Sequence, residues 1–173
     1  FISSSTINAN EKLNTDLNDQ NNDCKNITRD TVQERSFSND FVGTFNGKKI
    51  EYTASLKEKI IYEKDNPNLP MASFFYTEYI SKNTNQRPVI FSFNGGPGSA
   101  SLWLHMGVLG PKVIKVPSNA SDDGSPPYVI IDNKLSPLSD ADLVFIDPVG
   151  TGYSRAIGCH EGEEFWGVSE DPK

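Results

Sequence analysis

The chain has 173 residues, of which 36% are hydrophobic and 10% aromatic, enough apolar material for the core of one domain or of part of a larger one. Its net charge of −7 argues against a nucleic-acid backbone or an anionic membrane surface as partner, because both repel an acidic protein. No apolar run approaches the roughly 18 residues needed to cross a bilayer, so we expect no membrane partner either.

Residues 1–36 are rich in Asn, Asp, Ser and Thr, and their few apolar residues follow no steady period. Such a segment cannot bury enough apolar surface to offset the entropy lost on ordering. We therefore predict a disordered tail or linker over residues 1–36 and a folded portion over residues 37–173. The beginning at Phe1 instead of Met fits the trimmed end of a signal peptide and a truncated start equally well. A secreted, periplasmic, lysosomal or vacuolar location therefore depends on the source, and export stays open.

Folded structure is predicted to begin with a β-hairpin. Residues 41–45 and 48–53 are rich in apolar and β-branched side chains, and they flank Asn46-Gly47, the strongest short hairpin signal. A third strand is predicted over residues 72–80, which are largely aromatic. These strands mix polar and apolar residues, as is typical of the edge of a sheet.

The next two predicted strands, residues 89–93 and 143–146, are almost continuously apolar, which is typical of strands covered on both faces by helices. Between them the sequence predicts a short helix over residues 99–109 and two short strands at 113–116 and 128–131. The fold class is therefore α/β, with an antiparallel hairpin edge followed by parallel core strands.

Residues 94–98, Asn-Gly-Gly-Pro-Gly, form what we call the glycine segment. They directly follow one of these apolar strands and precede the predicted helix. Glycines let the backbone adopt positive φ and approach a ligand closely, and Pro97 stiffens the turn. Successive amide N–H groups can then converge on one spot and stabilise an oxyanion. Gly96 is the candidate for this oxyanion-stabilising amide.

Three sequence blocks together resemble the serine carboxypeptidase family: residues 88–99, the Leu-Gly-Pro at 109–111, and residues 142–154. The resemblance extends over roughly residues 41–166 and is closer to the bacterial branch. It implies that the chain is the N-terminal, incomplete portion of an α/β-hydrolase sheet in a serine-type carboxypeptidase.

The resemblance also implies roles for particular residues. Asn94, helped by the Gly95 amide, would bind the free C-terminal carboxylate of a peptide substrate, and the Gly96 amide would face the scissile carbonyl oxygen. Trp103 lies just beyond this segment, where lining the pocket of the leaving residue and packing in the core are both open. No metal and no cofactor is implied.

The sequence departs from the family pattern at two positions and in one loop. Many members have Cys where this chain has Ser99, and Glu where it has Val108. Without that Glu, the acidic pH preference common in the family is not implied here. The loop after the second apolar strand is also one residue shorter around Asp147-Pro148.

The catalytic Ser, Asp and His are expected to lie outside this chain, which by itself should be inactive and marginally folded. A nucleophile elbow needs G-x-S-x-G directly after a strand. The nearest match, residues 152–156, ends in Ala and begins several residues past its strand, which disfavours Ser154 as nucleophile. His105 is expected to pack in the structure or cap the helix. His160 is expected in a solvated loop beside acidic residues.

Two other functions remain open at this point. One is a catalytically silent binding module that keeps the hydrolase scaffold, because a fold alone does not establish an activity. The other is a different serine hydrolase, such as an aminopeptidase. The oligomeric state is not indicated.

The chain has two cysteines, Cys24 and Cys159, in different settings. Sequence alone does not say whether they pair, and two free thiols are the simpler interpretation.

Overall fold

In this computed structural model, residues 27–83, 86–95, 98–117 and 126–166 are described. Their elements, in chain order, are η1 (Arg29–Thr31), β1 (Ser36–Phe45), β2 (Lys48–Tyr62), β3 (Pro70–Ser81), β4 (Val89–Ser92), α2 (Leu102–Leu104), the π-helical η2 (His105–Leu109), β5 (Lys112–Ile114), β6 (Ile130–Asp132), η3 (Pro137–Ser139), β7 (Asp142–Ile146), β8 (Arg155–Ala156) and η4 (Gly162–Phe165).

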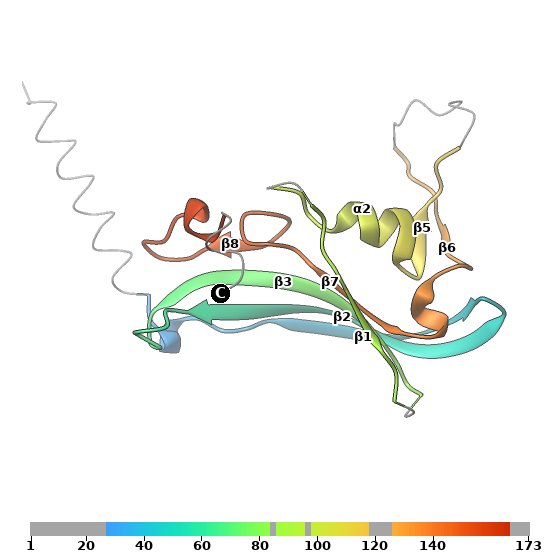
Figure 1. Cartoon of the computed structure of the whole chain (residues 1–173), viewed down its shortest axis with the longest axis horizontal. Helices are drawn as coiled ribbons and strands as arrows, with labels where there is room; N and C mark the ends of the chain where they lie inside the picture. The colour runs from blue at the N-terminus through green and yellow to red at the C-terminus, as the bar shows by residue number, and fades with distance from the viewer. Residues whose placement is uncertain (1–26, 84–85, 96–97, 118–125, 167–173) are drawn as a thin grey trace, which may run out of the picture.

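The main sheet has the strand order β1-β2-β3-β7-β4, and the short β8 also pairs with β3. The pairs β1–β2, β2–β3 and β3–β7 are antiparallel, whereas β7 and β4 run parallel. In Figure 1 the α2–η2 helix lies over one face of the sheet, and the β5–β6 ribbon rises away from it. An antiparallel edge followed by a parallel pair is the expected start of the α/β sheet, so the predicted fold class is confirmed.

The predicted hairpin is confirmed. Asn46 and Gly47 have φ values of 48° and 76°, the two left-handed residues of the turn, and Phe45 pairs with Lys48 across it. β3 is also confirmed, and its bounds extend the prediction slightly at both ends. The helix after the glycine segment begins at Leu102, three residues later than predicted.

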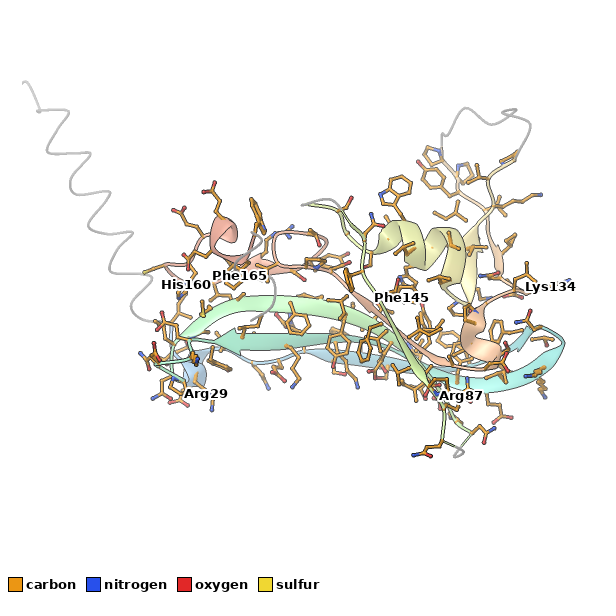
Figure 2. All side chains as sticks on the ribbon, in the orientation of Figure 1. Arg29, Arg87, Lys134, Phe145, His160 and Phe165 are labelled. Carbon is orange, nitrogen blue, oxygen red and sulfur yellow. The ribbon has the colours of Figure 1, made fainter. Side chains whose placement is uncertain are left out.

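The core lies between the sheet and the elements that connect β4 to β7. It is built from buried side chains of β1, β2, η3 and β7, namely Phe45, Tyr52, Leu138, Leu143 and Phe145. Leu104 and Leu109 of the α2–η2 helix pack against this cluster. In Figure 2, Phe145 lies on the sheet face that carries this helix. The core therefore fixes the helix that follows the glycine segment. None of the described helices has the length and hydropathy needed to span a membrane.

One expectation about the apolar strands is wrong for β4. β7 is covered as predicted, with Leu143, Val144 and Phe145 all buried. In β4, however, Val89 is 46% and Phe91 64% exposed. Val89 and Phe91 point to the same face of the sheet, and among the described residues no element covers this face at the outer strand β4.

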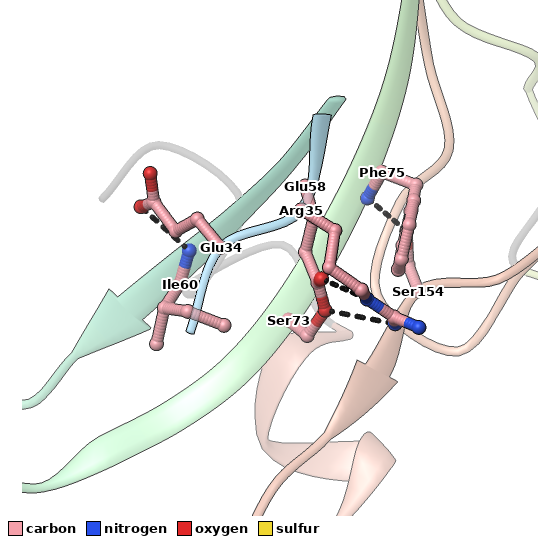
Figure 3. Close-up of polar contacts among 7 residues, drawn as sticks. All are labelled: Glu34, Arg35, Glu58, Ile60, Ser73, Phe75 and Ser154. Atoms are coloured by element: carbon pink, nitrogen blue, oxygen red, sulfur yellow. Dashed lines mark hydrogen bonds and ion pairs between the residues drawn. The ribbon is translucent and has the colours of Figure 1, made fainter. Parts of the chain in front are cut away.

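Part of the predicted tail contacts the sheet. The Arg29 amide donates a hydrogen bond to the Asn68 carbonyl at 2.9 Å. The Arg35 guanidinium pairs with Glu58 of β2 (Figure 3), and the distance between Nε and Oε2 is 2.6 Å. Residues 1–26 lie outside the described residues, so the predicted disorder is untested there.

The expectation of free thiols is wrong for Cys159, which is disulfide-bonded. Cys24 lies outside the described residues. Spacing alone did not indicate pairing because disulfide formation depends on the separation of the two Cβ atoms in the folded chain.

Candidate functional site

The glycine segment leaves β4 with its main chain accessible. Asn94 is half-buried and Gly95 exposed, and, apart from chain neighbours, no atom of the described residues lies within 4 Å of the position that a Cβ would take at Gly95 or Gly98. Gly98 has φ of 95°, the conformation for which glycine is favoured. The described residues provide no hydrogen-bonding partner for the Asn94 side chain or the Gly95 amide. These donors are therefore open to a ligand. Gly96 lies outside the described residues, and its predicted role is untested.

A second loop begins where β7, the parallel neighbour of β4, ends. The Asp147 amide donates to the Phe75 carbonyl of β3 at 3.0 Å. The hydroxyl of Ser154 donates to the Asp147 carbonyl at 2.7 Å and accepts from the Phe75 amide at 2.8 Å. Figure 3 shows the contact between Ser154 and Phe75. Ser154 is fully buried, so its hydroxyl braces this loop against the sheet and is not exposed as a nucleophile would be.

The carboxylate of Asp147 connects the two loops. Its Oδ1 accepts a hydrogen bond from the Ser101 amide at 2.8 Å, and the Ser101 hydroxyl donates to the Ile146 carbonyl. A Cβ at Gly152 would lie 2.1 Å from Asp147 Oδ2, so only glycine fits beside this carboxylate. Ser101 and Asp147 thus tie the beginning of α2 to the end of β7.

The Gly110-Pro111 pair closes the far end of the helix. A Cβ at Gly110 would lie 2.4 Å from the His105 carbonyl oxygen, which explains glycine at this position. The Asn133 side-chain amide donates to the carbonyls of Val108 and Gly110 at 2.7 and 2.9 Å. Carbonyls at the end of a helix lack partners within it, and Asn133 satisfies two of them.

His105 has the packing role that the sequence predicted. Its Nε2 lies 2.5 Å from the Tyr79 hydroxyl, and its ring stacks on Phe145 with the centroids 4.5 Å apart. Burial lowers the pKa of His105 to about 4 and raises that of Tyr79. His105 is therefore neutral at physiological pH, and its contacts with Tyr79 and Phe145 pack the helix against the sheet.

His160 is not in a solvated loop as expected. Its side chain is only 13% exposed, with Nδ1 2.8 Å from Glu164 and Nε2 3.3 Å from Glu63. The hydrogen bond from His160 is the main reason why the pKa of Glu164 lies below its usual value. Between residues 27 and 166, with the gaps given above, no three His, Cys, Asp or Glu side chains are placed to hold a metal.

A cavity of about 330 Å³ lies between the sheet and the helix. Leu56, Thr77 and Phe145 line it from the sheet, and Asp147 and Tyr153 from the loop after β7. Its lining is mainly apolar, and it does not include Asn94 or Gly95.

Trp103 does not pack in the core, because 71% of its surface is exposed. Its neighbour Leu104 does pack there. The role of Trp103 in a leaving-residue pocket stays a prediction.

A family model described as serine carboxypeptidase matches residues 62–160, which is more than half of the chain. The chain belongs to the serine carboxypeptidase family. The matched region contains the glycine segment, the helix after it and the loop after β7. The two loops that meet through Ser101 and Asp147 are thus both within the family-matched sequence.

Relatives in this family include the pheromone-processing carboxypeptidase KEX1 of two Saccharomyces cerevisiae strains. The protein of strain JAY291 is 34% identical over 102 residues, which cover 58% of this chain and 12% of that protein. The protein of strain FostersO is 33% identical over 102 residues, with the same coverage of 58% and 12%. The chain thus spans about an eighth of the length of these carboxypeptidases. The closeness to bacterial members stays a prediction.

Sequence reasoning singled out Asn94 and Gly95, whose roles stay predictions, but it did not identify the contact between Ser101 and Asp147. A signal for Asp147 was present, since it directly follows an apolar strand, as the glycine segment does. For Ser101 there was no comparable signal, because a serine near the beginning of a helix is usually read as a cap. Its side chain makes no such cap here.

Proposed function

We propose that the full-length protein is a serine-type carboxypeptidase that releases C-terminal residues from peptides. The observation that carries this proposal is the open pair of donors at Asn94 and Gly95, at the carboxyl end of β4 and within family-matched sequence. Ligands of open α/β sheets bind at the carboxyl ends of the strands, which is where these two residues lie.

The chemistry of the proposed site follows from neutral donors. The Asn94 side-chain amide and the Gly95 N–H bind the free carboxylate of the peptide substrate, and hydrogen bonds to a charged group are stronger than those between neutral groups. The Gly96 amide donates to the oxygen of the scissile carbonyl as negative charge develops there. The loss of one such donor typically reduces kcat about 100-fold or more. Trp103 contributes to the pocket for the leaving residue.

Acyl transfer needs a serine nucleophile, a histidine base and an aspartate that orients the histidine. We place all three in a continuation of this chain, so residues 1–173 alone hydrolyse nothing. Two observations support this. The Ser154 hydroxyl is engaged on both sides by main chain, and the chain covers only 12% of the KEX1 protein of strain JAY291.

The disulfide at Cys159 supports a location in an oxidising compartment, because structural disulfides persist mainly in secreted, periplasmic or endomembrane settings. A secreted, periplasmic, lysosomal or vacuolar protein meets this condition. Expression of the tagged protein in its source, followed by fractionation, would test this proposal. Recovery in the cytosol alone would contradict it.

Asn94→Ala in the full-length protein is the test of the carboxylate role. We expect KM for a free-acid peptide to rise roughly 10-fold or more, while KM for the same peptide amidated at its C-terminus changes little. Asn39→Ala, a control at an exposed asparagine of β1, should change neither value. Equal effects of Asn94→Ala on the two peptides would contradict carboxylate binding.

The same substrates separate the alternative functions. A wild-type protein that cleaves peptides with blocked and free C-termini equally well is another serine hydrolase, such as an aminopeptidase. A wild-type protein that binds peptides without cleaving them is a binding module on the hydrolase scaffold.

A further inference from the structure

We propose that Asp147 is a positioning residue, whose carboxylate holds the segment between Gly98 and the start of α2 and thereby the glycine segment of the active site. This inference rests on the proposed function. In this role Asp147 acts only as a hydrogen-bond acceptor, so an uncharged acceptor could replace it.

The main chain of Asp147 is itself clamped. Its amide donates to the Phe75 carbonyl, and its carbonyl accepts from the buried Ser154 hydroxyl. Ser154 in turn accepts from the Phe75 amide, so Asp147 is connected to β3 through three hydrogen bonds. These bonds fix the main chain of Asp147, and with it the start of its side chain, relative to the sheet.

The carboxylate reaches from this fixed point to Ser101. Asp147 Oδ1 accepts from the Ser101 amide at 2.8 Å, and Ser101 is only 2% exposed. The other carboxylate oxygen lies against Gly152, which limits rotation of the side chain. One oxygen thus receives an amide N–H, and the other is held by packing.

This contact matters because few hydrogen bonds hold the described residues between Gly98 and Ser101 to the sheet. Gly98 has a positive φ, and there is open space around it. In the described stretch that begins at Gly98, Ser101 is the first residue with a hydrogen bond to the β7 end of the sheet. Loss of the Asp147 acceptor would leave this stretch tied to the end of β7 by the Ser101 hydroxyl alone, and small misplacement in an active site costs large factors in rate.

Two substitutions distinguish a role of Asp147 as hydrogen-bond acceptor from a role that needs its negative charge. Asp147→Asn keeps a carbonyl oxygen for the Ser101 amide but removes the charge, whereas Asp147→Ala removes both. In the full-length protein with a free-acid peptide, we expect Asp147→Ala to lower kcat roughly 10- to 100-fold. Asp147→Asn should stay within about threefold of wild type, with an unshifted pH profile of kcat/KM. Asp132→Ala, which removes an exposed carboxylate of β6 paired with Lys112, serves as the control and should match wild type.

If Asp147→Asn loses as much activity as Asp147→Ala, or shifts the acid limb of the pH profile, the charge acts directly and the positioning role is overturned. Full activity of Asp147→Ala would overturn it as well.

Hydrogen exchange gives a second measurement that does not depend on activity. Peptides covering residues 98–104 should exchange at least about fivefold faster in Asp147→Ala than in wild type, because the Ser101 amide loses its acceptor. Asp147→Asn and Asp132→Ala should exchange like wild type. If the wild-type protein cleaves no peptide, the proposed function fails while exchange still decides whether Asp147 positions the segment. Unchanged exchange in Asp147→Ala overturns the inference in either case.

Discussion

The hydroxyl of Tyr79 lies 2.5 Å from Nε2 of His105, and the Phe145 ring stacks on the imidazole. Burial lowers the pKa of His105 to about 4, from an ordinary value of 6.5. An unfolded chain therefore takes up a proton at His105 at a pH where the folded chain does not. Stability that is fully present above pH 6.5 is lost as the pH falls from 6.5 toward 4, by on the order of 3 kcal/mol at most.

Denaturant unfolding of the full-length protein at several pH values between 4 and 7.5 measures this loss. His105→Gln keeps a hydrogen-bonding group without the titration and should show a flatter pH dependence between 4 and 6.5. Parallel curves for His105→Gln and wild type would show that His105 titrates normally in the folded state.

Ser154→Ala should destabilise the protein by about 1–3 kcal/mol, because it leaves the buried Phe75 amide without its acceptor. Ser36→Ala is the matched control, since Ser36 is an exposed serine of β1 for which no side-chain hydrogen bond is found among the described residues. Its effect should stay within about 0.5 kcal/mol. Chemical unfolding measures both values. A loss no greater for Ser154→Ala than for Ser36→Ala would contradict the bracing role of Ser154.

Gly152→Ala and Gly47→Ala compare two glycines with positive φ. At Gly47, with φ of 76° and no atom within 4 Å of a Cβ, the substitution adds only backbone strain of about 1–2 kcal/mol. At Gly152 the same strain is joined by a clash with the Asp147 carboxylate. We expect Gly152→Ala to lower Tm by at least twice as much as Gly47→Ala in thermal unfolding. Similar Tm changes would mean that the loop after β7 yields easily.

Arg35→Met should lower Tm by on the order of 5 °C at neutral pH, because it leaves the buried Glu58 carboxylate without its cation. The hydrogen bond from Arg35 is the main reason why the pKa of Glu58 lies below its ordinary 4.5. This contribution is present above pH 4.5 and is lost as the pH falls through the lowered pKa, so the Tm difference should shrink in acid. Lys59→Met, at an exposed lysine paired with Glu34, should leave Tm within about 1 °C. A pH-independent difference for Arg35→Met would indicate lost packing instead.

Much of the local structure could be predicted because its signals are local. Asn46-Gly47 prefers the left-handed conformations of a tight hairpin turn, and the structure has the turn there. The apolar run at 143–146 became the buried β7 for the same reason, since its own composition suits a strand covered on both faces. The similar run at 89–93 did not become a buried strand, because coverage of a face depends on elements from elsewhere in the chain, and among the described residues none covers the face of Val89 and Phe91.

The candidate site was predictable only in part. Asn94 and Gly95 stand in a contiguous motif whose chemistry can be read along the chain. The partner of Asp147 is Ser101, which is 46 residues away in sequence, and the partner of Ser154 is Phe75, 79 residues away. Neither hydrophobic periodicity nor motif spacing predicts contacts between residues so far apart in the sequence.

The sequence by itself determined the hairpin, the two apolar strands, the helix after the glycine segment and the membership of the serine carboxypeptidase family, because turn preference, hydrophobic pattern and motif are properties of neighbouring residues. The tertiary structure alone decided that Ser154 is a buried brace, that Asp147 holds the Ser101 amide and that Trp103 is exposed. The physical reason is that a polar side chain takes its role from the donors and acceptors that folding brings to it, and these come from strands distant in the chain.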